Sequence, residues 1–153
     1  MTNEALQQLI AAWIPDLEFW EEGSEFLNIE VVPKQLHNLM SRLKDDDATR
    51  FDYLFCLSGV DWEESLGVIY HLESTEHRHC IVVRVKTQDR DNPKIDTVSD
   101  IWYTADFHER EVFDFFGIEF NNHPNLKRLF LTDEWEGYPL RKDYEDEINM
   151  IIK

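Results

Sequence analysis

The chain has 153 residues, and its 32 acidic and 15 basic side chains give a formal net charge of −17 at pH 7. A chain of this length is a common size for one domain and buries about 70% of its unfolded surface, which is enough for a self-sufficient core. The excess of negative charge repels a phosphate backbone, so we expect no nucleic-acid partner.

The N-terminal part of the chain predicts two amphipathic helices separated by a hairpin. Residues 3–14 place apolar side chains at helical spacing behind Thr2, which suits an N-cap. Partial alternation over residues 18–22 and 25–32 predicts a hairpin around a Gly-Ser turn. Pro33 suits a first helical turn, and the apolar stripe after it predicts a helix that stops near residues 45–47.

The middle of the chain predicts three strands, at residues 53–60, 67–73 and 79–87. Their connections are hairpin-like, so an antiparallel sheet is the economical arrangement. Residues 88–96 form a polar loop, and the hydroxyl of Thr97 is placed to cap a short helix that runs through Trp102. A further helix over residues 106–116 should end at Gly117.

Little periodicity is left after Phe120. The fold class expected from these elements is α+β, a mainly antiparallel sheet with helices packed on it, plus an extended C-terminal tail. We divide the chain into a globular domain of residues 1–120 and a partner-binding tail of residues 121–153, because so long an irregular segment is typical of a functional or partner-ordered one.

Charge is unevenly spread along the chain. Residues 1–33 hold seven acidic side chains and no Lys or Arg, whereas residues 121–142 hold four basic side chains against three acidic ones. Such a basic segment either folds back onto its own acidic body or reaches an acidic groove on another protein.

The ionisable residues of the helix at 106–116 first suggest a metal site. His108 and Glu111 lie three residues apart, as two metal ligands would, and Arg110 and Asp114 have the spacing of an ion pair. The other histidines have no spacing that completes a metal site, and two cysteines are too few for an iron–sulfur cluster that takes four thiolates. We expect no metal or cofactor in this chain.

A catalytic site is not expected either. The carboxylates that follow the predicted strand at residues 53–60, beginning at Asp61, are predicted to form a solvated turn and not an acid–base pair. The five glycines form no phosphate-binding loop, and no Ser or Cys stands in a nucleophile motif.

The N-terminus lacks the features of a targeting segment. The sequence MTNEALQQLIAAWIP has no positively charged region, and its run without charge ends after Pro15, which is too short for a membrane span. We therefore expect a cytoplasmic protein.

Two dense motifs lie between Phe107 and Tyr144. The first reads HERE from His108 and continues to Asp114 and Gly117; the second is WEGYPLRKDY from Trp135, preceded by His-Pro and Leu-Lys-Arg pieces. In order and spacing they resemble the 30-kDa subunit family of respiratory complex I (NDH-1), the proton-pumping NADH:quinone oxidoreductase. The resemblance covers roughly residues 30–145 and is densest after Asp100.

This resemblance implies a structural, non-catalytic subunit of the peripheral arm that supports electron transfer from NADH to quinone. It implies docking on the subunit that forms the quinone pocket, close to the subunit that holds the terminal iron–sulfur cluster. FMN and iron–sulfur clusters are then held by partner subunits and not by this chain. The implied location is peripheral, on the cytoplasmic side of the inner (plasma) membrane, with membrane contact only through the complex.

The expected partner interface combines positions that match the family motifs with aromatic residues of the kind enriched at interfaces. These residues are Glu109, Arg110, Glu111, Asp114, His123, Lys127, Arg128, Trp135, Glu136, Tyr138, Arg141, Lys142 and Asp143. Tyr138 stands where His is common in the family, which argues against a proton-carrying role there. The chain ends soon after Tyr144, as expected for a stand-alone subunit not fused to the quinone-pocket subunit.

Two alternatives stay open. Related proteins occur in energy-converting hydrogenases and in ferredoxin- or F420-dependent dehydrogenases, so this chain is alternatively the equivalent subunit of such a complex. Outside the family, the alternative is a free-standing acidic binding protein whose tail folds on itself. Neighbouring genes that encode flavin and NADH-oxidising subunits would argue against the first alternative, and the mass of the native complex tests the second.

Overall fold

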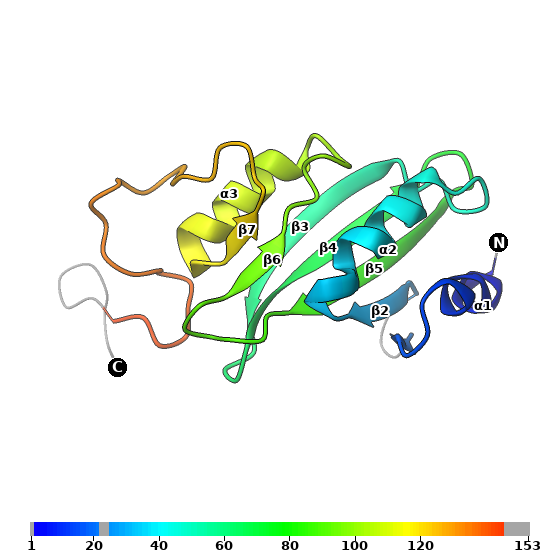
Figure 1. Cartoon of the computed structure of the whole chain (residues 1–153), viewed down its shortest axis with the longest axis horizontal. Coiled ribbons are helices and arrows are strands. Elements are labelled where there is room, and N and C mark those ends of the chain that lie inside the picture. Colours follow the sequence, from blue (N-terminus) through cyan, green and yellow to red (C-terminus); the bar gives the residue numbers. More distant parts are fainter. Residues whose placement is uncertain (1, 22–24, 146–153) are drawn as a thin grey trace.

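The computed structural model describes residues 2–21 and 25–145. In chain order the elements are α1 (Asn3–Trp13), β1 (Glu18–Trp20), β2 (Leu27–Val31), α2 (Pro33–Asp45), β3 (Tyr53–Asp61), β4 (Leu66–Ser74), β5 (His79–Lys86), β6 (Lys94–Asp96), α3 (Ala105–Phe116) and β7 (Glu119–Asn121). The α+β class is confirmed, with helices packed on one sheet (Figure 1).

Five strands form one sheet in the order β1-β2-β5-β4-β3. Every pairing in it is antiparallel except that of β2 with β5, where Leu27 pairs with Ile81 in parallel register. The expectation of an antiparallel sheet is therefore correct for the meander β3–β4–β5 and wrong at β2. The reason is the crossover β2–α2–β3: the helix returns the chain to the far edge of the sheet, so two strands inserted later separate β2 from β3.

One face of the sheet carries the core. Alternate residues of the central strands, such as Val68, Tyr70 and Val83, are fully buried. The apolar stripe of α2 packs against them, with Leu36 and Leu39 fully buried. Each such leucine stabilises the fold by about 1.5–3 kcal/mol relative to an exposed one.

The predicted N-terminal elements are confirmed where the structure describes them. The hydroxyl of Thr2 accepts the backbone N–H of Ala5 at 3.1 Å, so Thr2 caps α1 as expected. The hairpin β1–β2 and the helix that begins at Pro33 are also present. Residues 22–24, which include the expected turn and the end of its first strand, lie outside the described residues.

Two predictions between residues 88 and 121 are wrong. Residues 97–102 form no helix but a single turn, in which Trp102 donates its backbone N–H to Val98. The end of the predicted polar loop is a strand, β6, which pairs in parallel with β7. Three-residue strands leave too little alternation to be detected, and each is stabilised by a neighbour far along the chain.

The segment of residues 122–145, called here the C-terminal segment, contains no helix or strand in the described chain. It leaves β7, runs past α3 and returns toward the sheet (Figure 1). Residues 146–153 of the predicted tail lie outside the described residues.

Candidate functional site: α3 and the C-terminal segment

Helix α3 ends as its sequence predicts. Gly117 adopts the left-handed conformation (φ 75°) and donates its backbone N–H to Phe113 at 2.9 Å. A Cβ atom at this position would lie 2.5 Å from the ring of Tyr138. Glycine is therefore required twice, by the backbone conformation and by the close approach of the C-terminal segment.

Glu109 fixes the first half of α3 to the turn before it. Its buried carboxylate accepts the backbone N–H of Val98 at 3.0 Å and the hydroxyl of Thr97. The Thr97 hydroxyl thus binds α3 instead of capping a helix of its own. Burial raises the pKa of Glu109 to about 7, although both hydrogen bonds oppose the rise. Burial together with the charge of Glu109 also raises the pKa of the Tyr70 phenol.

His123 adds a third group to this buried cluster. Its imidazole is fully buried, and Nδ1 accepts the backbone N–H of Asn125 at 3.0 Å, so the proton of the neutral ring is on Nε2. That Nε2 lies 3.0 Å from a carboxylate oxygen of Asp106 and 4.0 Å from one of Glu109. The start of the C-terminal segment is thereby fastened to α3.

Asp114 fastens the middle of the segment. One oxygen of its buried carboxylate accepts three consecutive backbone N–H groups, from Leu129, Phe130 and Leu131, at 3.2, 2.7 and 3.1 Å. Its other oxygen accepts Arg128 at 3.2 Å. Charge-assisted bonds of this kind are about twice as strong as neutral ones.

The expected Arg110–Asp114 ion pair is not formed. The Arg110 guanidinium turns instead to the backbone carbonyls of Lys127 and Arg128, at 3.3 and 3.5 Å. Asp114 is saturated by the segment that folds over it, which spacing along a helix does not reveal.

Asp61, at the end of β3, fastens the end of the segment. Arg90 binds its carboxylate with two bonds, at 2.7 and 2.9 Å, and Lys142 donates its backbone N–H at 2.8 Å. The hydrogen bonds from Arg90 hold the pKa of Asp61 well below its usual range. Arg90 also lies 3.3 Å from Asp143. The prediction of a solvated turn at Asp61 is wrong, since this carboxylate is buried.

Two arginines of the C-terminal segment enclose Tyr138. The guanidinium carbons of Arg128 and Arg141 lie 5.1 and 4.8 Å from the centre of its ring. Arg128 also donates to the carbonyl of Gly137 at 3.0 Å, and Arg141 to that of Phe116 at 2.6 Å. The basic segment of residues 121–142 could either fold back onto its own chain or bind another protein. The described part folds back onto its own chain.

The predicted interface residues therefore divide into two groups. Those that bind other parts of this chain are Glu109, Arg110, Asp114, His123, Arg128, Tyr138, Arg141, Lys142 and Asp143. Glu111, Lys127 and Glu136 are exposed, and Trp135 is half-buried. The indole N–H of Trp135 is buried with no hydrogen-bond partner in the described chain. Partner binding at any of these positions stays a prediction.

Several apolar side chains near α3 are exposed, and most of them were not predicted from the sequence. Tyr103 is 87% exposed, Phe107 60%, Phe130 63% and Leu140 55%. A helical-wheel count of α3 would have found Phe107, because it lies on the face opposite the buried Val112. Phe130 is one of the aromatic residues after Pro124 that the sequence marks as candidates for an interface, whereas Leu140 follows no periodicity and gave no signal.

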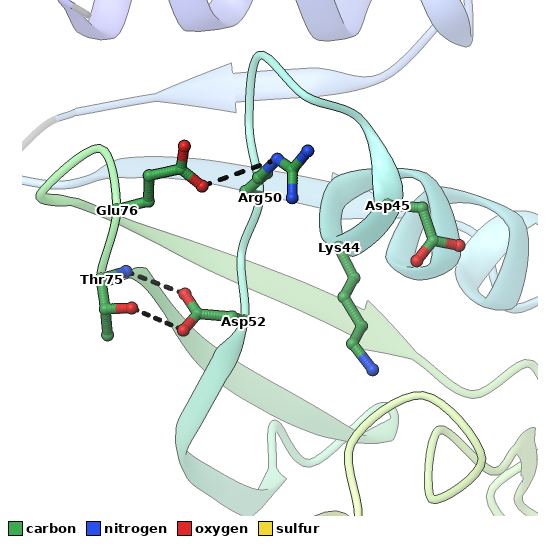
Figure 2. A pocket seen from close by; sticks show the side chains of 6 residues that line it. All are labelled: Lys44, Asp45, Arg50, Asp52, Thr75 and Glu76. Carbon is green, nitrogen blue, oxygen red and sulfur yellow. Dashed lines mark hydrogen bonds and ion pairs between the residues drawn. The ribbon is translucent and has the colours of Figure 1, made fainter.

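A separate hollow lies between the end of α2 and the β4–β5 turn (Figure 2). Most of the charges that line it are already paired. Asp52 accepts the hydroxyl and the backbone N–H of Thr75 at 2.5 and 2.8 Å, and Arg50 lies 3.6 Å from Glu76. These contacts join the loop before β3 to the β4–β5 turn.

The described ranges, 2–21 and 25–145, contain no group of three or more His, Cys, Asp or Glu side chains arranged to hold a metal ion. Within the same ranges, no helix has the length and apolar character needed to cross a bilayer.

The fold and the site together define an α+β domain whose long irregular segment is fastened to one helix by buried carboxylates. The family described as "Respiratory-chain NADH dehydrogenase, 30 Kd subunit" matches residues 29–148. The chain belongs to this family, and the resemblance stated from its two motifs is confirmed.

Relatives of two lengths are similar to the chain. The C/D subunit of NADH-quinone oxidoreductase from Phocaeicola vulgatus is 50% identical over 79% of this chain, and the chain spans only 23% of that protein. The C subunit of NADH-quinone oxidoreductase from Chlorobium phaeobacteroides is 37% identical, over 95% of this chain and 93% of the relative.

Two solved structures share the fold. The trypsin-resistant fragment (1–134) of Nqo5 superposes with a TM-score of 0.71 at 28% identity, over 82% of this chain and all of the fragment. A polypeptide of the membrane-bound sulfane sulfur reductase, an archaeal respiratory membrane complex, superposes with a TM-score of 0.80 at 25% identity, over 95% of this chain and 86% of that one.

Proposed function

We propose that this chain is the 30-kDa-type subunit of a proton-translocating NADH:quinone oxidoreductase, complex I, and a structural, non-catalytic part of its peripheral arm. The observation that carries the proposal is the likeness along nearly its whole length to the C subunit of the Chlorobium NADH-quinone oxidoreductase. In this role the chain binds neither NADH nor quinone, and it supports electron transfer by holding other subunits in place.

The quinone-pocket subunit is the proposed main partner. Relatives with the name C/D support it, since that name joins two subunits in one polypeptide, of which this chain matches about a quarter. The terminal-cluster subunit is proposed as a second neighbour from the family resemblance. FMN and the iron–sulfur clusters belong to partner subunits in this proposal.

The proposed location is peripheral, on the cytoplasmic side of the plasma membrane, with attachment through the complex. The formal charge of −17 favours contact with protein over direct contact with anionic lipid.

Deletion of the gene and complementation with a tagged copy test the proposal. Membranes from the deletion strain should lose NADH:quinone reduction and keep quinol oxidation. The tagged chain should restore the lost activity and co-purify with the quinone-pocket and terminal-cluster subunits. A tagged chain that restores nothing and purifies alone would contradict the proposal.

The equivalent subunit of another membrane complex is a second candidate, favoured by the likeness to the sulfane sulfur reductase polypeptide. An energy-converting hydrogenase or a ferredoxin- or F420-dependent dehydrogenase belongs to this group. Membranes can be supplied with NADH, reduced ferredoxin or reduced F420 as the electron donor. The oxidation of only one of these donors should depend on the tagged chain, and that donor identifies the complex. The third candidate, a free-standing acidic binding protein, requires a native mass equal to that of the chain alone.

A further inference from the structure

An exposed stripe runs along the outer side of α3. Phe107, Glu111 and Phe115 follow one another at steps of four residues, which places them one above the other on a helix. Phe107 and Glu111 are exposed, and Phe115 is half-buried. Tyr103, in the turn that leads into α3, is also exposed. A helix of this length measures about 18 Å.

The C-terminal segment widens this stripe. The ring of Phe130 stacks on that of Phe115, with centroids 5.8 Å apart and planes inclined by 13°. Leu140 lies at a groove of about 240 Å³ formed by β3 and α3, whose other apolar walls include Leu57 and Phe116. The bonds of Asp114 and the backbone bond from Leu140 to Phe115, at 3.1 Å, hold these added side chains in place.

Glu111 gives the stripe its chemical character. The other carboxylates of α3 are all engaged: Asp106 with His123, Glu109 with Val98 and Asp114 with Arg128. Glu111 lines the groove and is exposed, and its carboxylate makes no hydrogen bond or ion pair in the described chain. Burial of a carboxylate under an apolar partner surface costs several kcal/mol unless the partner also supplies a cation that pairs with it.

We propose that this stripe docks an apolar segment of another subunit that carries one Lys or Arg, and that this cation pairs with Glu111. The inference rests on the proposed function and adds the chemistry of the partner. Exposed aromatic side chains that are held rigidly are typical anchors of an interface, and an acidic residue at their centre selects a cation. A second copy of the chain is a poor occupant, since both copies would bring a charge of −17 to the contact.

Charge reversal at the centre of the stripe tests the pairing in the assembled complex. The tagged chain carries Glu111→Lys or, as a matched control, Glu18→Lys on β1, which is exposed at the opposite edge of the sheet. Glu111→Lys should lower the recovery of partner subunits at least tenfold without changing the melting temperature, and Glu18→Lys should leave the recovery unchanged. Equal recovery with both variants would overturn the inference.

Photo-crosslinking identifies the occupant. A benzoylphenylalanine placed at Phe107 or Phe130 in the intact complex should crosslink to one apolar peptide with a Lys or Arg within a helical turn. The same residue at Tyr53, an exposed aromatic outside the stripe, should not give that crosslink. A crosslinked peptide without a basic residue, a crosslink to a second copy of this chain, or no crosslink at all would overturn the inference.

The two proposals fail in different ways. A wild-type chain that recovers no partner subunit contradicts the proposed function and the inference together. A wild-type chain that assembles normally, alongside an equally competent Glu111→Lys variant, contradicts only the inference.

Discussion

Glu109→Gln should change how stability depends on pH. The pKa of Glu109 in the folded chain is about 7, against an ordinary value of 4.5. The folded state therefore binds a proton more tightly than the unfolded state does. The stabilisation from the protonated group is complete below pH 4.5 and is lost as the pH rises through 7. This difference in pKa corresponds to a loss of about 3 kcal/mol in the free energy of unfolding.

Glutamine keeps an oxygen for the N–H of Val98 but does not titrate. Urea unfolding at several pH values from 5 to 9 measures both proteins, and the quantity of interest is the difference between their unfolding free energies. The variant should gain about 3 kcal/mol relative to the wild type between pH 5 and 9. Groups that do not interact with Glu109 cancel in this difference. A difference that does not vary with pH would show that the carboxylate stays ionised in its buried site.

Three further predictions concern the fastening of the segment. Asp114→Ala should destabilise the fold by about 3–5 kcal/mol, since it removes the carboxylate that pairs with the charge of Arg128 and leaves three backbone N–H groups without their acceptor. Hydrogen exchange should show faster exchange in the C-terminal segment than in β4. Gly117→Ala combines backbone strain with a clash against Tyr138, so urea unfolding should show a loss of more than about 1 kcal/mol. Arg110→Ala should cost under about 1 kcal/mol by the same measurement, because this half-buried side chain forms only long hydrogen bonds to carbonyls and a loose contact with the Phe107 ring, 5.9 Å from its centre. A loss of several kcal/mol would show a tightly held guanidinium.

The sequence predicted what depends on local pattern. The helices α1, α2 and α3 follow from apolar spacing and from caps at Thr2 and Gly117, and β3, β4 and β5 follow from their apolar runs. The parallel pairing of β2 with β5 and the small sheet of β6 and β7 were not predicted. Both depend on contacts between segments far apart in the chain, which no local pattern encodes.

The same limit applies to the site. The motifs of α3 and of the C-terminal segment were located, yet the partners of their charges were not. Asp114 was assigned to Arg110 by helical spacing, whereas a neighbouring segment supplies its true partners. Asp61 and Arg90 meet across a long stretch of chain, and neither stands in a motif. The exposure of Leu140 can be recognised only when the path of the irregular segment is known.

The position of β2 also affects how the chain folds. The hairpins of β3, β4 and β5 join neighbours in sequence and can form early, whereas β2 must wait until β5 is in place, because Leu27 pairs with Ile81 across the whole of α2 and two strands. Until then the β5 edge presents unpaired backbone groups, and an open edge of this kind readily pairs with another molecule. During synthesis the N-terminal hairpin therefore leaves the ribosome well before β5, the strand on which it docks. A shortened chain that lacks β1 and β2 should therefore aggregate through β5, even though it keeps α3 and the C-terminal segment.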